Sequence, residues 1–157
     1  MKNILLLLSA LLVGNLFGTP NIHEALKNPS AVKTLQFNGT ANEAALFTKN
    51  ASKFTSLREI VLSGISDSII AEQDIVAVAA CSSVNKLSIE NCGISHLSGA
   101  LRMLISVQEI NISNCKKIQV EGMFSAVATM PALKNQKFAY TNASNQLIVP
   151  DFLFSLR

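Results

Sequence analysis

The sequence contains few of the residues on which enzymes and metalloproteins depend. Its 157 residues include no tryptophan, one tyrosine, two histidines and three cysteines. Structural zinc sites need cysteines or histidines paired at short spacings, whereas Cys81, Cys92 and Cys115 are 11 and 23 residues apart. The sequence also has no glycine-rich phosphate-binding loop. We therefore expect no metal site, no cofactor, no catalytic residue and no enzymatic activity.

Charge is also scarce. Charged residues make up 15% of the chain, the formal net charge is +3, and lysine and arginine form no run. A nucleic-acid surface needs clustered basic residues, so we expect no nucleic-acid partner. Hydrophobic residues make up 49%, which excludes a disordered chain. The length is sufficient for one domain with its own core and no need of disulfides.

Long apolar runs are confined to the amino terminus. Lys2 precedes a nearly all-apolar stretch, 4–17, which is shorter than the roughly 20 residues that span a bilayer. This pattern predicts a secretory signal peptide over 1–18, cleaved after Gly18, and a secreted domain over 19–157 with no stable membrane anchor. An uncleaved anchor or a buried first helix is the alternative.

Secretion would make the Asn-x-Ser/Thr sequons candidate sites of glycosylation. Such short patterns also arise by chance in a chain rich in asparagine and serine, so their use stays open. The four acceptor residues are Asn38, Asn50, Asn111 and Asn142.

An internal repeat is the most informative feature of the sequence. Five segments share the pattern apolar-x-x-apolar-x-apolar, and successive starts are 25, 27, 23 and 26 residues apart. A period of about 20–29 residues is typical of solenoids in which each unit contributes a strand and a helix. The five segments are Val32–Phe37, Leu57–Leu62, Val84–Ile89, Val107–Ile112 and Leu133–Phe138.

The third and fourth copies also carry a cysteine at the ninth position, Cys92 and Cys115. With this feature the chain resembles the leucine-rich repeat family, in its ribonuclease-inhibitor-like and cysteine-containing variants, over roughly residues 20–157. The resemblance implies an α/β fold: a solenoid of about five repeats with a parallel concave sheet and convex helices. The last copy departs from the pattern, because Gln136 takes the place of its fourth-position aliphatic residue.

The linking segments predict the helical wall of such a fold. Apolar residues recur with helical spacing in 72–80, and Pro131 ends a helix predicted over 121–130. We expect Ser98 to cap a helix over 99–104, and a short helix over 22–27 to precede the first strand. Alternating strands and helices are the order expected of a parallel sheet.

The cysteines fit a structural role. Cys92 and Cys115 would fill the ninth positions as small buried groups. They would also lie on adjacent repeats, at about the 5 Å spacing of strands, so a disulfide between them is the alternative.

The strand residues between the inward-facing ones are the candidate binding surface. In leucine-rich repeats such side chains project from the concave sheet and commonly carry binding. Glu59, Lys86 and Glu109 alternate in charge across neighbouring strands, which indicates either cross-strand ion pairing or a specific recognition surface. The predicted binding residues are Arg58, Glu59, Val61, Asn85, Lys86, Ser88, Gln108, Glu109 and Asn111.

These patterns predict a secreted, non-enzymatic protein that recognises an unidentified protein partner or ligand through its concave sheet. The alternatives are a structural component of an extracellular coat or wall, an intracellular adaptor if 1–18 is no signal, and a hydrolase of atypical fold. We expect the apolar end, 152–157, to pack as a cap, with self-association through this end as the alternative.

Overall fold

The computed structural model describes residues 19–37, 41–64, 72–133, 138–141 and 147–148. Its six strands form one sheet whose spatial order follows the sequence. The first five are parallel, which confirms an α/β fold with a parallel sheet, and β6 pairs antiparallel with β5. The strands are β1 (Thr34–Phe37), β2 (Glu59–Ser63), β3 (Lys86–Glu90), β4 (Glu109–Ser113), β5 (Phe138–Thr141) and β6 (Leu147–Ile148).

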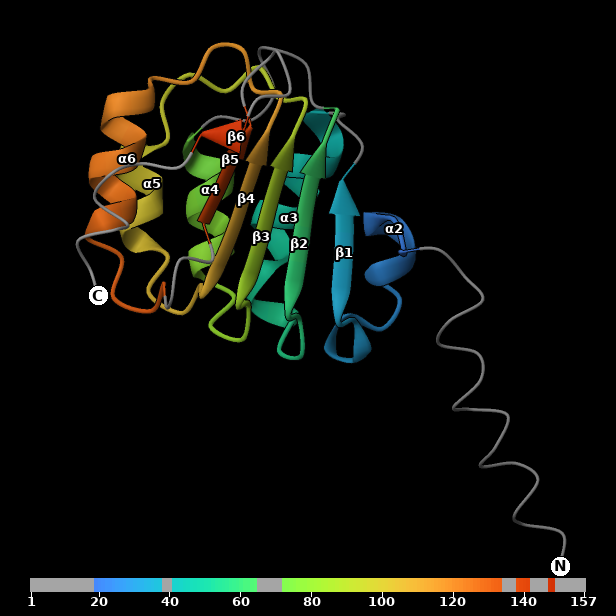
Figure 1. Cartoon of the computed structure of the whole chain (residues 1–157). Helices are drawn as coiled ribbons and strands as arrows, with labels where there is room; N and C mark the ends of the chain where they lie inside the picture. The colour runs from blue at the N-terminus through green and yellow to red at the C-terminus, as the bar shows by residue number, and fades with distance from the viewer. Residues whose placement is uncertain (1–18, 38–40, 65–71, 134–137, 142–146, 149–157) are drawn as a thin grey trace, which may run out of the picture.

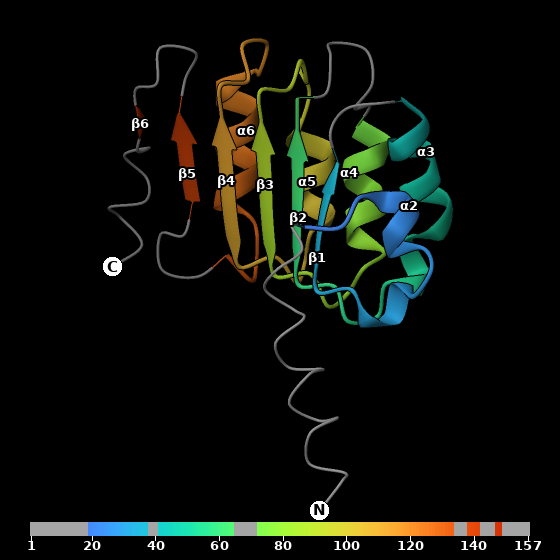
Figure 2. The same cartoon turned by 90° about the vertical axis from the view of Figure 1, so that its right-hand side faces the viewer.

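Four helices connect successive parallel strands and cover one face of the sheet (Figures 1 and 2). Each packs against the next along the chain. A short helix, α2 (Ile22–Ala25), packs against β1 at the edge of the sheet. The connecting helices are α3 (Ala41–Asn50), α4 (Glu72–Ala79), α5 (Ser98–Met103) and α6 (Val120–Ala128), with short 3-10 turns η2 (Pro29–Ala31) and η3 (Ala51–Lys53).

The repeat places identical positions of successive strands side by side. Its fourth and sixth positions form two rows of paired residues, and every member is buried against the helices. Burying an aliphatic side chain contributes roughly 1.5–3 kcal/mol, so these rows are the main source of stability in the sheet. The rows are Leu35, Ile60, Leu87, Ile110 and Phe138, then Phe37, Leu62, Ile89, Ile112 and Tyr140.

The predicted register of the fifth repeat is wrong by two residues. Phe138 pairs with Ile110 and therefore occupies the fourth position, which the sequence pattern assigned to Gln136. Tyr140 takes the sixth position beside Ile112. The physical reason is that the observed register puts two aromatic rings, rather than an amide, into the apolar rows. Both rings contact Phe124 of α6 edge to face, with centroids 5.9 and 6.0 Å away.

The helices agree with the sequence in part. α4, α6 and α2 lie within or near their expected ranges. Ser98 was expected as a cap, but it is the first residue of α5, and Leu97 occupies the N-cap without a side-chain hydrogen bond. α3 and β6 were not predicted, although the alanines of α3 favour a helix.

The chain leaves three strands through the same turn. Gly64, Asn91 and Asn114 follow β2, β3 and β4 with φ of 65°, 55° and 51°, in the left-handed region that glycine and asparagine tolerate best. The backbone N–H of each donates to the last carbonyl of the next strand, at 2.9–3.0 Å. After Asn91 and Asn114 the chain continues to α5 and α6 of the helical layer.

No helix within the described residues is long and apolar enough to cross a membrane. The predicted signal peptide, 1–18, and the apolar end, 152–157, lie outside the residues that the structure describes.

Candidate functional site

The face of the sheet opposite the helices is the candidate functional site, and we call it the open face. Alternate strand residues project from it in three columns, which β-sheet pairing aligns. All are half-buried except Ser88, which is buried. The columns are Thr34, Glu59, Lys86 and Glu109; then Gln36, Val61, Ser88, Asn111 and Ala139; then Ser63, Glu90, Ser113 and Thr141.

A charged trio occupies the centre of the first column. Lys86 Nζ lies 2.9 Å from Glu59 Oε1 and 3.7 Å from Glu109 Oε1, so the expected cross-strand ion pairing is confirmed. The hydrogen bond to Glu59, supported by the charges of both carboxylates, raises the pKa of Lys86. Because all three side chains contact solvent, each pair contributes only about 0–1 kcal/mol to stability. The trio therefore defines the charge pattern of the surface more than it stabilises the fold.

Ser88 departs from its predicted exposure. Its relative exposure is 5%, although its column faces away from the helices. The reason is the size of its neighbours, since the short serine side chain lies between Val61 and Asn111 on the flanking strands. A partner would meet the flanking residues before it reached the Ser88 hydroxyl.

Three predicted residues lie just before the strands. Arg58, Asn85 and Gln108 are exposed, and their backbone N–H groups donate to the equivalent residue of the preceding repeat, at 2.7–2.9 Å. Arg58 also donates from Nη1 to the carbonyl of Ser83, at 3.2 Å. This bond holds the guanidinium against the next turn, at the end of the sheet where the strands begin.

A shallow hollow of about 470 Å³ lies on the open face over β3, β4 and β5. It forms beside Asn111, whose neighbours Ser88 and Ala139 have small side chains. The sequence pattern missed Phe138 and Ala139 because of the error in the fifth register; the aromatic residues at 138 and 140 were the available signal. The lining residues are Lys86, Ser88, Glu109, Ile110, Asn111, Phe138 and Ala139.

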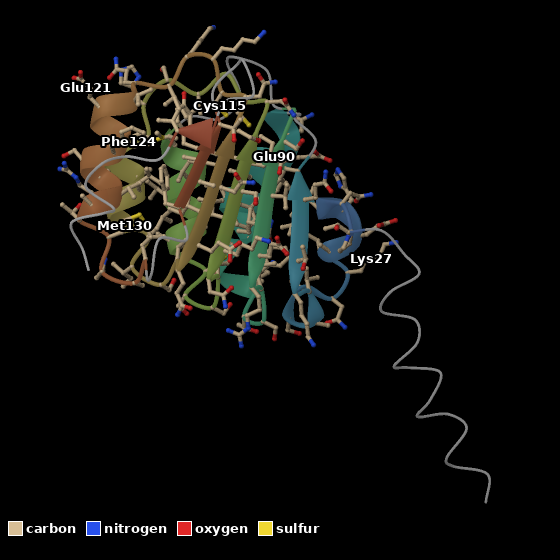
Figure 3. The ribbon with its side chains drawn as sticks, in the orientation of Figure 1. Lys27, Glu90, Cys115, Glu121, Phe124 and Met130 are labelled. Atoms are coloured by element: carbon tan, nitrogen blue, oxygen red, sulfur yellow. The ribbon has the colours of Figure 1, made fainter. Side chains whose placement is uncertain are left out.

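Glu90 extends the acidic character of the face toward the carboxyl ends of the strands (Figure 3). It stands between Ser63 and Ser113 in the third column. With Thr141 beyond Ser113, this column is polar throughout. The open face therefore combines a central ion-paired trio with a hydroxyl-rich edge and few aromatic groups.

The three cysteines are buried and form no disulfide with one another, as the structural interpretation predicted. Cys81 Sγ donates to the Ala51 carbonyl at 3.1 Å, and burial raises the pKa of this thiol to about 11. His96 follows Cys92 by four residues, but its ring is exposed and Nδ1 pairs with Ser95 Oγ at 2.8 Å. Within the described ranges, no three histidine, cysteine or acidic side chains gather in a group suited to a metal ion.

Two of the four sequons fall on described residues. Asn50 is only 9% exposed and its Nδ2 donates to the Leu46 carbonyl at 2.8 Å, which disfavours a glycan on that atom. Asn111 is half-buried at the middle of the open face, where a glycan would compete with a partner. Asn38 and Asn142 lie outside the described residues.

Comparison with known proteins found no matching family model, no matching curated protein and no matching solved structure.

Proposed function

We propose that this chain is a secreted, non-enzymatic repeat protein of the leucine-rich type, which recognises a protein partner through its open face. The observation that carries the proposal is the alignment of the repeat. Equivalent residues of successive strands stand side by side, with the apolar set toward the helices and the polar set outward. Such a surface presents side chains from several strands at fixed spacings, which suits recognition of an extended surface.

The charges of the trio supply the selectivity in this proposal. Lys86 lies between two carboxylates, so a partner meets alternating charges spaced by about 4.8 Å, the distance between strands. Complementary charges on the partner favour one orientation, while like charges oppose the others. The hollow beside Asn111 would accept a small side chain of the partner.

A charge inversion tests this proposal with the fold preserved. The triple variant Glu59→Lys, Lys86→Glu, Glu109→Lys retains both ion pairs and reverses every charge of the trio. Glu121→Lys on α6 is the matched control, because it changes the formal charge equally and lies on the helical side.

The assay is crosslinking of each purified protein in extracts of its native surroundings, followed by quantitative mass spectrometry. We expect at least one protein to be retained by the wild type and the control and lost from the triple variant. Equal retention by all three proteins, or self-association alone, would contradict recognition through the open face. Self-association would instead favour the structural component of a coat or wall.

Secretion is a separate part of the proposal. It is supported only by the sequence pattern of the segment 1–18. We expect the exported protein to begin near residue 19, as measured by the intact mass of the secreted form. Retention of the full-length chain inside the cell would favour the intracellular adaptor.

A further inference from the structure

Cys92 and Cys115 occupy equivalent places, two residues after the ends of the neighbouring strands β3 and β4. Glu90 and Ser113, two residues before them, are paired between β3 and β4. One asparagine with a left-handed backbone, Asn91 or Asn114, separates each of these paired residues from the cysteine that follows it. Asn114 Nδ2 donates to Asn91 Oδ1 at 2.6 Å. Because the Asn91–Asn114 bond keeps the two segments side by side just beyond the strands, we expect the cysteine Cα atoms near the strand spacing of about 4.8 Å, within the range of about 4.4–6.8 Å that a disulfide bridges.

The two thiols also share a common hydrogen-bonding environment. Cys92 Sγ donates to the Glu90 carbonyl at 3.2 Å, and Cys115 Sγ to the Ser113 carbonyl at 3.4 Å. The side chains have relative exposures of 2% and 1%. Once Cys115 is ionised, the Cys92 thiol donates to its sulfur instead; this hydrogen bond, together with one from the Cys92 backbone, lowers the pKa of Cys115 against the opposing effects of burial and of the Glu90 charge.

The third cysteine is also buried and also bonds to a carbonyl, but its pKa shifts in the opposite direction to that of Cys115. Cys81 bonds to the Ala51 carbonyl at 3.1 Å, and burial raises its pKa to about 11. The thiolate is the reactive form of cysteine, so Cys81 is protected from oxidation at neutral pH. The fold therefore separates one inert thiol from a pair of neighbouring ones.

We propose that Cys92 and Cys115 form an oxidation site, at which hydrogen peroxide converts the two thiols into a disulfide between the segments that follow β3 and β4. Peroxide is small enough to enter when the irregular segment 92–97 opens locally, which costs less than opening a strand. The site is independent of the proposed recognition function.

The reaction has two balanced steps. The Cys115 thiolate attacks one peroxide oxygen, the O–O bond breaks, and the departing hydroxide takes up the proton that Cys115 released, giving water and a sulfenic acid. The Cys92 sulfur then attacks the Cys115 sulfur, the S–O bond breaks, and the hydroxyl group leaves as water with the Cys92 proton. Two thiols and one peroxide thus give one disulfide and two waters.

Peptide mapping of the native wild-type protein tests the proposal directly. Trypsin places the three cysteines in separate peptides, Glu59–Lys86, Leu87–Arg102 and Met103–Lys116. After treatment with peroxide and alkylation, we expect the second and third peptides to be crosslinked with the loss of two hydrogens, and Cys81 to be alkylated. Dithiothreitol should reverse the crosslink.

The same treatment in guanidinium is the control, because an unfolded chain should give mixed pairings that include Cys81. Crosslinks to Cys81 in the native protein, sulfinic acid without a crosslink, or unreacted Cys92 and Cys115 would each overturn the proposal.

Single variants test which thiol reacts first. In Cys92→Ser, the hydroxyl keeps a hydrogen-bond donor for the Cys115 thiolate but removes the partner thiol, so we expect dimedone to label the Cys115 sulfenic acid. In Cys115→Ala, labelling of Cys92 should fall at least several-fold. Equal labelling in both variants would contradict the assignment of Cys115 as the attacking thiol.

Discussion

Replacement of Tyr140 by alanine tests the register of the fifth strand. In the structure Tyr140 is 4% exposed, pairs with Ile112, and meets Phe124 edge to face with ring centroids 6.0 Å apart. Truncation of a buried aromatic residue costs about 3–5 kcal/mol, of which an aromatic pair supplies about 0.5–1.5 kcal/mol. Because β5 lies near the end of the sheet, where neighbours relax more readily, we expect a loss of about 3 kcal/mol.

Urea unfolding followed by circular dichroism measures this loss as a lower midpoint at an unchanged slope. For a domain of this size, about 3 kcal/mol corresponds to a fall in Tm of roughly 10 °C. Thr141→Ala is the control, because Thr141 is half-buried on the other face of the same strand, and we expect a change within about 0.5 kcal/mol. A Tyr140→Ala loss below about 1 kcal/mol, no larger than that of the control, would refute the observed register.

Three further predictions concern other parts of the fold. Burial raises the Cys81 pKa from 9.0 to about 11. The neutral thiol therefore stabilises the fold below pH 9, and this contribution is lost as the pH rises toward 11. In Cys81→Ala, the fall in the free energy of unfolding over this pH range should be smaller by roughly 2–3 kcal/mol, as measured by urea unfolding at several pH values. Asn91 has φ of 55°, so Asn91→Ala should destabilise by about 1–2 kcal/mol and more than Asn91→Gly, and equal losses would contradict a left-handed turn. A double-mutant cycle on Lys86 and Glu59 should give a coupling below about 1 kcal/mol that shrinks at 1 M salt, and a larger, salt-independent value would indicate a desolvated pair.

The apolar rows could be predicted from the sequence because they depend on a local pattern. The spacing of Leu87 and Ile89, repeated by Ile110 and Ile112, marks the inward positions without any knowledge of pairing. The charged trio followed from the same alignment, since equal positions in successive repeats become strand neighbours. This regularity is why the parallel sheet, which the strand pairing confirms, could be predicted.

The sequence-based predictions failed where strand pairing, rather than the local sequence pattern, determines which residues are buried. Leu133–Phe138 matches the apolar pattern at its first and sixth positions only, and pairing with β4 places Phe138 and Tyr140 in the apolar rows instead, because their rings pack on Phe124. The burial of Ser88 depends on the size of Val61 and Asn111, which become its neighbours only in the folded sheet. The position of the hollow beside Asn111 depends on both the register of the fifth strand and the burial of Ser88, so the sequence alone could not locate it.

The order of the sheet has a consequence for how the chain folds. Strands adjacent in space are also consecutive in the sequence, and the main helix contacts likewise join consecutive helices. Each new strand therefore closes a loop of only two to three dozen residues, for which the entropic cost is modest. A chain that leaves the ribosome can add one strand and one helix at a time to the structure already formed, with no early segment waiting exposed for a distant partner.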